Sequence, residues 1–226
     1  MNNRILSAYD WFLIVGIIAA NIVYSVMADE IDVVGSIAAI AGVLCVVLVA
    51  KGSIWNYLFG LVNVSLYAYV SFKASAYGDA ALNALYYLPM QFIGYFAWKK
   101  RVNDTTVKAR RLTSVQRLWV AAGCIALTVA VGFILKACGD AQPFKDSATT
   151  VLSIVAQILM AMAFMEQWVL WILTNVISVV MWVMFAIKGE PHAEVMIIMW
   201  VFYLLNSLNG LIVWLRLSES DRANRD

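Results

Sequence analysis

Long apolar stretches alternate with short polar connections along most of the chain. The stretches hold about 17 to 22 residues, the length at which a helix rising ~1.5 Å per residue crosses a ~30 Å hydrocarbon core. Because the apolar residues come in blocks and do not alternate with polar ones, a transmembrane β-barrel is excluded. The pattern therefore predicts eight transmembrane helices, over residues 11–28, 33–50, 54–72, 80–98, 118–136, 149–164, 167–187 and 195–215.

The composition agrees with an all-α integral membrane protein. Hydrophobic residues make up 63% of the chain, charged residues make up 13%, and the mean hydropathy is +0.81, values outside the range of soluble globular domains. No small-residue cleavage site closes the first apolar stretch, so we expect a retained helix and not a signal peptide. The three cysteines, Cys45, Cys124 and Cys138, lie in apolar contexts that favour packing over a disulfide framework or a metal site.

The positive charges predict the orientation of the helices, because cytoplasmic loops retain Lys and Arg. With the N-terminus inside, twelve of the sixteen Lys and Arg residues fall in cytoplasmic segments. We therefore predict that both termini are cytoplasmic. Residues 99–117 form the one sizeable basic run, and we interpret this linker as a topology determinant beside anionic lipid, not as a nucleic-acid-binding segment.

The helix order contains a weak internal repeat. Segments 55–63 and 168–175 each begin with a Trp and place an Asn about two turns later, and the predicted helix that follows each one ends at a Trp, Trp98 or Trp214. Helices two to four and six to eight would then form two equivalent triplets.

These triplets, residues 33–98 and 149–215, would be parallel repeats related by an axis along the membrane normal. A repeat with an odd number of crossings needs one additional crossing between its copies, and the apolar helix at 118–136 is predicted to be that linker. With the helix at 11–28, the expected fold class is one N-terminal helix plus a 3+1+3 transmembrane core, followed by a cytoplasmic tail at 216–226.

Amide and aromatic side chains recur along faces of several predicted helices. Buried polar groups are costly in hydrocarbon unless they pair with another helix or meet a polar ligand, so these stripes predict a cavity between the triplets. The helix at 80–98 also contains Pro89, which frees a carbonyl and kinks a helix. For each amide the alternative is that it only holds helices together. The candidate substrate-binding residues are Asn63, Tyr87, Gln91, Trp168, Trp171, Asn175, Trp182 and Asn206.

Absent residue types narrow the function. The predicted helices hold no Asp, Glu, Lys, Arg or His at depth, and the single histidine, His192, lies in a predicted outer loop. Ion-coupled carriers, intramembrane serine proteases and metalloproteases need such groups, and no phosphate-binding loop is present. We expect no enzyme activity and no cofactor. A neutral pocket of amides and aromatic rings suits an uncharged or softly cationic ligand with hydroxyls and a flat ring. We therefore favour a transporter of such a molecule. The alternative outside transport is a membrane docking or signalling protein.

Two sequence strings identify a family. Residues 168–175 read Trp-x-x-Trp-x-x-x-Asn, and residues 89–98 read Pro-x-Gln-x-x-Gly-Tyr-x-x-Trp. Over about residues 33–215 the chain resembles the PnuC family of bacterial nicotinamide riboside transporters, while the N-terminal helix falls outside the resemblance.

The resemblance implies that the fold has the full-length architecture of the SWEET sugar transporters, with both triplets in one chain. It also implies assembly as a homotrimer in the bacterial inner membrane. It implies facilitated diffusion of nicotinamide riboside without ions or ATP, and trapping of the product by a cytoplasmic riboside kinase. The pyridinium ring would stack on Trp182 or Tyr87, while the amides Asn63, Gln91, Asn175 and Asn206 hold the ribose and the carboxamide. Thiamine, riboflavin or a sugar are the alternative cargoes.

Overall fold

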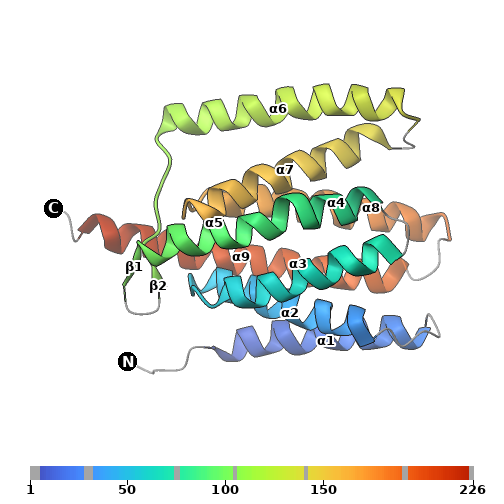
Figure 1. The fold of residues 1–226 in the computed structure, drawn as a ribbon, viewed down its shortest axis with the longest axis horizontal. Coiled ribbons are helices and arrows are strands. Elements are labelled where there is room, and N and C mark those ends of the chain that lie inside the picture. Colours follow the sequence, from blue (N-terminus) through green and yellow to red (C-terminus); the bar gives the residue numbers. More distant parts are fainter. Residues whose placement is uncertain are drawn as a thin grey trace.

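The protein is described by a computed structural model over residues 6–27, 33–73, 77–103, 106–139, 142–189 and 193–223. Nearly all of these residues are helical, which confirms the predicted all-α class (Figure 1). The elements are α1 (Ala8–Met27), α2 (Val33–Ala50), α3 (Asn56–Lys73), α4 (Tyr77–Ala81), a π-helical turn (Leu82–Tyr87), α5 (Leu88–Lys99), β1 (Val102–Asn103), β2 (Thr106–Val107), α6 (Ser114–Ala137), α7 (Pro143–Ala161), α8 (Gln167–Ile187) and α9 (Ala193–Ala223). His192 and the last three residues of the predicted tail lie outside the described residues.

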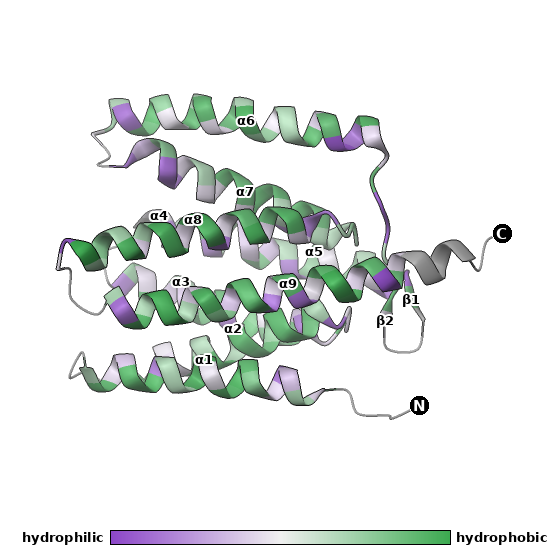
Figure 2. Ribbon diagram, turned by 180° about the vertical axis from the view of Figure 1, so that it is seen from behind, coloured by the Kyte–Doolittle hydropathy of each residue, from purple (hydrophilic) through white to green (hydrophobic). Residues whose placement is uncertain are grey.

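The helices have the length and surface of membrane spans. In the described part of the chain, α1, α2, α6, α8 and α9 are each long and apolar enough to cross a bilayer. Large apolar side chains lie on the outside of the bundle, including Trp119 at 72% exposure and Ile187 at 81%. Figure 2 shows α6 as hydrophobic along most of its length. Such a surface is satisfied by lipid and not by water, so this is a multi-pass membrane protein.

The fourth predicted helix is not one regular helix. Residues 80–98 are divided among α4, the π-helical turn and α5, and the N–H of Leu88 donates to the carbonyl of Asn83 across the wider turn. Pro89 follows directly, in the first turn of α5, and because the helix runs on from the π-helical turn, its missing N–H leaves a carbonyl of the preceding turn without a helical donor. π-Helical turns inside α-helices are frequent at functional sites.

Two other boundaries differ from those expected from hydropathy. α7 begins at Pro143, six residues before the predicted start, because proline is favourable in the first turn of a helix even where the next residues are polar. The basic linker is partly ordered. β1 and β2 pair antiparallel, and Thr113 caps α6 through a reciprocal capping box with Gln116.

Two turns of similar geometry connect helices at the same end of the bundle. The α2–α3 turn (residues 51–55) and the α7–α8 turn (residues 162–166) each place their second residue in the left-handed region, Gly52 at φ 66° and Ala163 at φ 60°. The linker binds both turns: the N–H of Val107 donates to the Gly52 carbonyl at 2.8 Å, and the N–H of Arg110 donates to the Ala163 carbonyl at 2.7 Å. The linker therefore joins the two turns through backbone bonds.

α1 and α6 lie at opposite edges of the bundle (Figure 1). α1 packs on α2 and α9, where Leu13 and Ile17 are fully buried. α6 packs on α7, and Gly132 of α6 sits against the Phe144 ring. The remaining helices form the centre. α1 begins and α9 ends at the end of the bundle that carries β1 and β2 (Figure 1).

Candidate functional site

The central helices enclose a cavity of about 340 Å³. Its lining comes from α2, α3, the π-helical turn, α5, α7, α8 and α9, and within the described residues none of it comes from α1 or α6. The lining residues are Gly42, Cys45, Val46, Val49, Gly60, Asn63, Val64, Asn83, Tyr87, Gln91, Gln157, Met160, Trp168, Trp171, Asn175, Trp200, Tyr203, Asn206 and Ser207.

The cavity is electrically neutral. Its described lining contains no Asp, Glu, Lys, Arg or His; the polar groups are amides, hydroxyls, indoles and a thiol. No group of three or more His, Cys, Asp or Glu in the described chain could hold a metal ion. Aromatic faces attract delocalised cations, and amides can both donate and accept hydrogen bonds. The lining therefore suits a flat, uncharged or singly cationic organic ligand.

Seven of the eight residues singled out in the sequence line this cavity: Asn63, Tyr87, Gln91, Trp168, Trp171, Asn175 and Asn206. Trp182 does not line it. Its ring packs edge-on against Phe185 at a centroid distance of 5.4 Å. Residues seven apart share a helix face, but they lie about 10 Å apart along the axis, so Trp182 is on the face of Asn175 and beyond the depth of the cavity.

Several cavity amides also join neighbouring helices. Asn175 Nδ2 donates to Ser207 Oγ at 2.7 Å, which links α8 to α9. Asn206 Nδ2 donates to the Val46 carbonyl at 3.1 Å, which links α9 to α2, and Asn63 Nδ2 donates to the Ala38 carbonyl at 2.8 Å. These amides therefore hold helices together and line the cavity at the same time.

Other polar atoms around the cavity are buried and have no hydrogen-bond partner among the described residues. These atoms are Gln91 Oε1, Gln157 Nε2, Trp168 Nε1 and Asn206 Oδ1. Each unpaired buried group costs about 1–3 kcal/mol, and buried polar groups in proteins are nearly always paired. A bound polar ligand could restore bonds to such atoms.

The π-helical turn and a glycine together position Gln91. Gln91 Nε2 donates to the Tyr87 carbonyl at 3.2 Å, at the junction of the turn with α5. Its Oε1 lies so close to Gly60 of α3 that a Cβ at residue 60 would overlap it. The absence of a side chain at Gly60 therefore makes room for the Gln91 amide.

The sequence reading missed Gln157, Trp200 and Ser207 as cavity residues. Gln157 is an amide in the middle of an apolar helix, but it belongs to no stripe of amide and aromatic residues such as the one that selected Asn175. Ser207 follows Asn206 directly, and a single serine in a transmembrane helix carries little signal. Trp200 lies near the start of α9, where an interfacial aromatic belt would explain it equally well.

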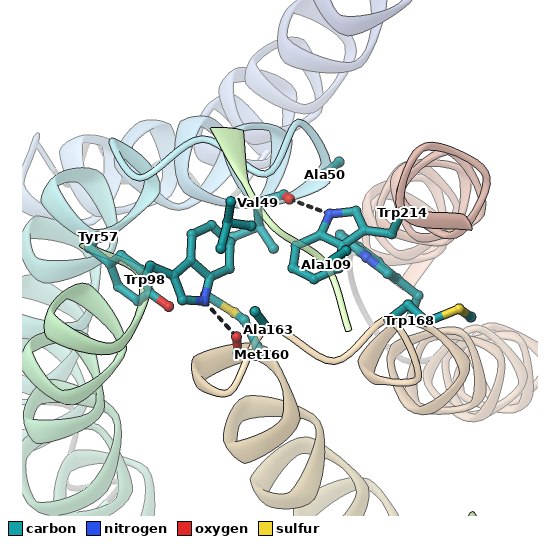
Figure 3. Packing of buried hydrophobic residues seen from close by; sticks show 11 residues of the cluster. Val49, Ala50, Tyr57, Trp98, Ala109, Met160, Ala163, Trp168 and Trp214 are labelled. Atoms are coloured by element: carbon teal, nitrogen blue, oxygen red, sulfur yellow. Dashed lines mark hydrogen bonds between the residues drawn. The ribbon is translucent and has the colours of Figure 1, made fainter. Parts of the chain in front are cut away.

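An aromatic cluster, composed of Tyr57, Trp98, Trp168 and Trp214, fills the bundle beside the two turns (Figure 3). Trp98 and Trp214 are fully buried, with ring centroids 5.6 Å apart. Trp168 belongs to the cluster and also lines the cavity. The cluster therefore borders the cavity on this side.

The contacts of the cluster occur in corresponding pairs. Trp98 Nε1 of α5 donates to the Met160 carbonyl of α7 at 2.8 Å, and Trp214 Nε1 of α9 donates to the Val49 carbonyl of α2 at 2.9 Å (Figure 3). A similar pairing involves glycines: a Cβ on Gly94 would meet the Tyr57 ring, and a Cβ on Gly210 would meet the Trp168 ring.

Comparisons with known proteins give one consistent result. The family model described as "Nicotinamide mononucleotide transporter" matches residues 32–216. "Nicotinamide riboside transporter PnuC" of Neisseria mucosa is 43% identical over 188 residues, covering 80% of this chain and 72% of that protein. The Escherichia coli protein of the same name is 31% identical over 223 residues, covering 87% of this chain and 90% of its relative.

A solved structure is also similar. The protein described as "Crystal structure of the Vitamin B3 transporter PnuC" is 38% identical, with a TM-score of 0.77 over 95% of this chain and 94% of the other. Because α1 begins at Ala8, it lies before the region matched by the family model.

Proposed function

Because this chain belongs to the PnuC family of transporters, we propose that it imports nicotinamide riboside across the bacterial inner membrane by facilitated diffusion. The relatives are named for this cargo. The observation that carries the proposal is the neutral cavity of about 340 Å³ with its aromatic and amide lining, a volume in the range of about 300–1,000 Å³ for small-molecule sites.

The chemistry of the cargo matches the lining. A pyridinium ring can stack on Trp171, Trp200, Tyr203 or Tyr87, whose faces attract a delocalised cation. Ribose hydroxyls and a carboxamide need both donors and acceptors, which amide side chains provide. Asn206 Oδ1 has no hydrogen-bond partner among the described residues, so it can accept a bond from a ribose hydroxyl.

The same lining argues against a phosphorylated cargo, although the matching family model is described by the mononucleotide. Burying a phosphate dianion without a cationic partner costs several kcal/mol or more, and the described lining holds no Lys or Arg. We propose that a cytoplasmic riboside kinase phosphorylates the imported riboside, and that the product is trapped because the cavity does not accept a phosphate. Measurable transport of the mononucleotide would contradict the proposal.

The cavity also lacks a group for ion coupling. Proton-coupled carriers place a titratable carboxylate or histidine along the path, and the described lining contains none. We propose a uniporter driven by the riboside gradient alone. Uptake into proteoliposomes should continue when proton and sodium gradients are collapsed, and a requirement for either gradient would refute this mechanism.

We further propose that the core consists of two parallel triplets, α2 to α5 and α7 to α9, joined by α6. The paired turns, glycine contacts and Trp hydrogen bonds support this arrangement. Rocking of one triplet against the other would open the cavity at the aromatic cluster. The bonds from Trp98 to α7 and from Trp214 to α2 join the two triplets, so opening there would break both.

The end with the aromatic cluster is proposed to face the cytoplasm, with both termini on that side. Its connections and helix ends carry nine of the sixteen Lys and Arg residues of the chain: Lys51, Lys99, Lys100, Arg101, Lys108, Arg110, Arg111, Arg117 and Arg216. Assembly as a homotrimer is an expectation from the family resemblance, and light scattering of the purified protein would measure it.

The test of the cargo is calorimetric titration of the purified protein with nicotinamide riboside, thiamine, riboflavin and glucose. We expect selective binding of the riboside, weakened about tenfold or more by Asn175→Ala and by Trp171→Ala. The matched controls are Asn21→Ala in α1, where the amide donates to the Ile17 carbonyl, and Trp119→Ala at the exposed surface of α6. Binding of none of the four compounds would favour a docking or signalling role.

A further inference from the structure

Two glutamines beside the cavity each keep one buried polar atom unpaired. Gln91 of α5 and Gln157 of α7 are both 5% exposed, and both line the cavity. Among the described residues, Gln91 Oε1 and Gln157 Nε2 have no hydrogen-bond partner. One is an acceptor and the other is a donor, so a ligand group that both donates and accepts would satisfy them together.

Contacts between α5 and α7 bracket both glutamines within one stretch of the bundle. α5 and α7 pack against each other, and two hydrogen bonds define their register: Tyr86 Oη, just before α5, donates to the Ile154 carbonyl at 2.7 Å, and Trp98 Nε1 donates to the Met160 carbonyl at 2.8 Å. Gln91 and Gln157 both lie between these two contacts in sequence. The helices therefore bring the two amides to one region of the cavity wall.

The orientation of Gln91 is fixed by its own helix. Its Nε2 donates to the Tyr87 carbonyl at 3.2 Å. A rotation of the amide by 180° would place Oε1 against that carbonyl oxygen, where two acceptors repel. Gln91 therefore keeps an acceptor, Oε1, as its unpaired atom and cannot readily exchange it for a donor.

We propose that Gln91 and Gln157 read the carboxamide of the substrate. The carboxamide oxygen accepts from Gln157 Nε2, and the carboxamide NH₂ donates to Gln91 Oε1. This assignment rests on the proposed transport of nicotinamide riboside and adds its selectivity. Nicotinic acid riboside carries a carboxylate in place of the carboxamide, which has no donor and would place negative oxygen against Gln91 Oε1. The site therefore selects the amide form over the acid form.

The test compares the two ribosides on the purified full-length protein by calorimetric titration. We expect wild type to bind nicotinamide riboside at least about tenfold more tightly than nicotinic acid riboside. Gln157→Leu and Gln91→Leu keep most of the side-chain volume and remove the amide, so each should weaken nicotinamide riboside and bring the affinity ratio toward one. Asn21→Leu, an amide-to-leucine change on α1 outside the lining, should leave both affinities and their ratio unchanged.

The outcomes separate this proposal from the proposed function. Tight nicotinamide riboside binding with an equal affinity for the acid form would overturn the carboxamide assignment and leave the transport function standing. Equal weakening of both ribosides by Gln157→Leu, with the ratio unchanged, would also overturn it, because it would place a shared ribose hydroxyl at the glutamines. Failure of folded wild type to bind nicotinamide riboside would remove the proposed function, and this inference with it. Thermal unfolding of each variant verifies that it is folded.

Discussion

Gly60→Ala tests whether the space at one glycine controls the binding site. A methyl group on residue 60 would overlap Gln91 Oε1 and lie 3.1 Å from Cys45 Sγ. The Gln91 amide is the free end of a flexible side chain, so it can turn away while the helices stay in place. That movement would break its bond to the Tyr87 carbonyl and withdraw its acceptor from the cavity.

The expected effect of Gly60→Ala is large on affinity and small on stability. Replacing a helical Gly by Ala stabilises a helix by about 0.8–1.0 kcal/mol, and losing the Gln91–Tyr87 bond costs about 0.5–1.5 kcal/mol, so the two nearly cancel. Leaving a carboxamide donor of the ligand unpaired costs about 1–3 kcal/mol, which corresponds to about 5- to 150-fold in Kd.

The assay is titration of nicotinamide riboside, paired with thermal unfolding in the same detergent. Gly123→Ala in α6 is the matched control, since nothing lies within 4 Å of a Cβ at that position; it should leave Kd unchanged. In a Gln91→Ala background, Gly60→Ala should have almost no further effect on Kd, because the group it displaces is gone. A Kd for Gly60→Ala within twofold of wild type would refute the reasoning, as would an undiminished effect in the Gln91→Ala background.

Three further predictions concern stability and pH. Gly94→Ala and Gly210→Ala should each lower the free energy of unfolding by about 1–3 kcal/mol, because the added Cβ meets a packed aromatic ring; thermal unfolding that matches Gly123→Ala would contradict this. Asp10 is fully buried and lies 2.7 Å from Lys51 Nζ, so Asp10→Ala should destabilise by about 2–4 kcal/mol, and adding Lys51→Met should recover part of the loss in the same assay. Riboside affinity should be flat between pH 6 and 8, since the described lining holds no Asp, Glu or His, and a sigmoidal pH profile would contradict that expectation.

Hydropathy predicts this fold well because the bilayer imposes one simple constraint. A block of apolar residues of the right length has to be a helix, since hydrocarbon satisfies no backbone group, and each predicted span corresponds to described helix. The π-helical turn before Pro89 was not predicted. The turn depends on which backbone carbonyls keep a hydrogen-bond donor next to Pro89, which has no N–H. The spacing of apolar residues contains no information about these backbone bonds.

The candidate site shows the same limit. Helical spacing placed Asn175 and Trp182 on one face of the helix. Spacing predicts the face on which a side chain lies, but not how far along the helix axis the cavity extends, and of these two residues only Asn175 lines the cavity. Gln157 was passed over because α7 carries a single mid-helix amide and no stripe. A lone amide becomes meaningful only when packing shows what surrounds it, here α5 and the cavity that Gln91 also lines.

The proposed internal repeat is weak in the sequence for a physical reason. After the α2–α3 turn and after the α7–α8 turn, some positions belong to the aromatic cluster and others line the cavity. The second residue of α3 and of α8 is an aromatic member of the cluster, Tyr57 or Trp168. The fifth residues are cavity residues and differ completely, Gly60 in one and Trp171 in the other. The proposed rocking would use equivalent contacts in both triplets, whereas a ligand without symmetry needs two different walls. Under that proposal, substitution at a position that lines the cavity without belonging to the cluster, such as Trp171, should change selectivity, while substitution at a position that belongs only to the cluster, such as Tyr57, should change opening.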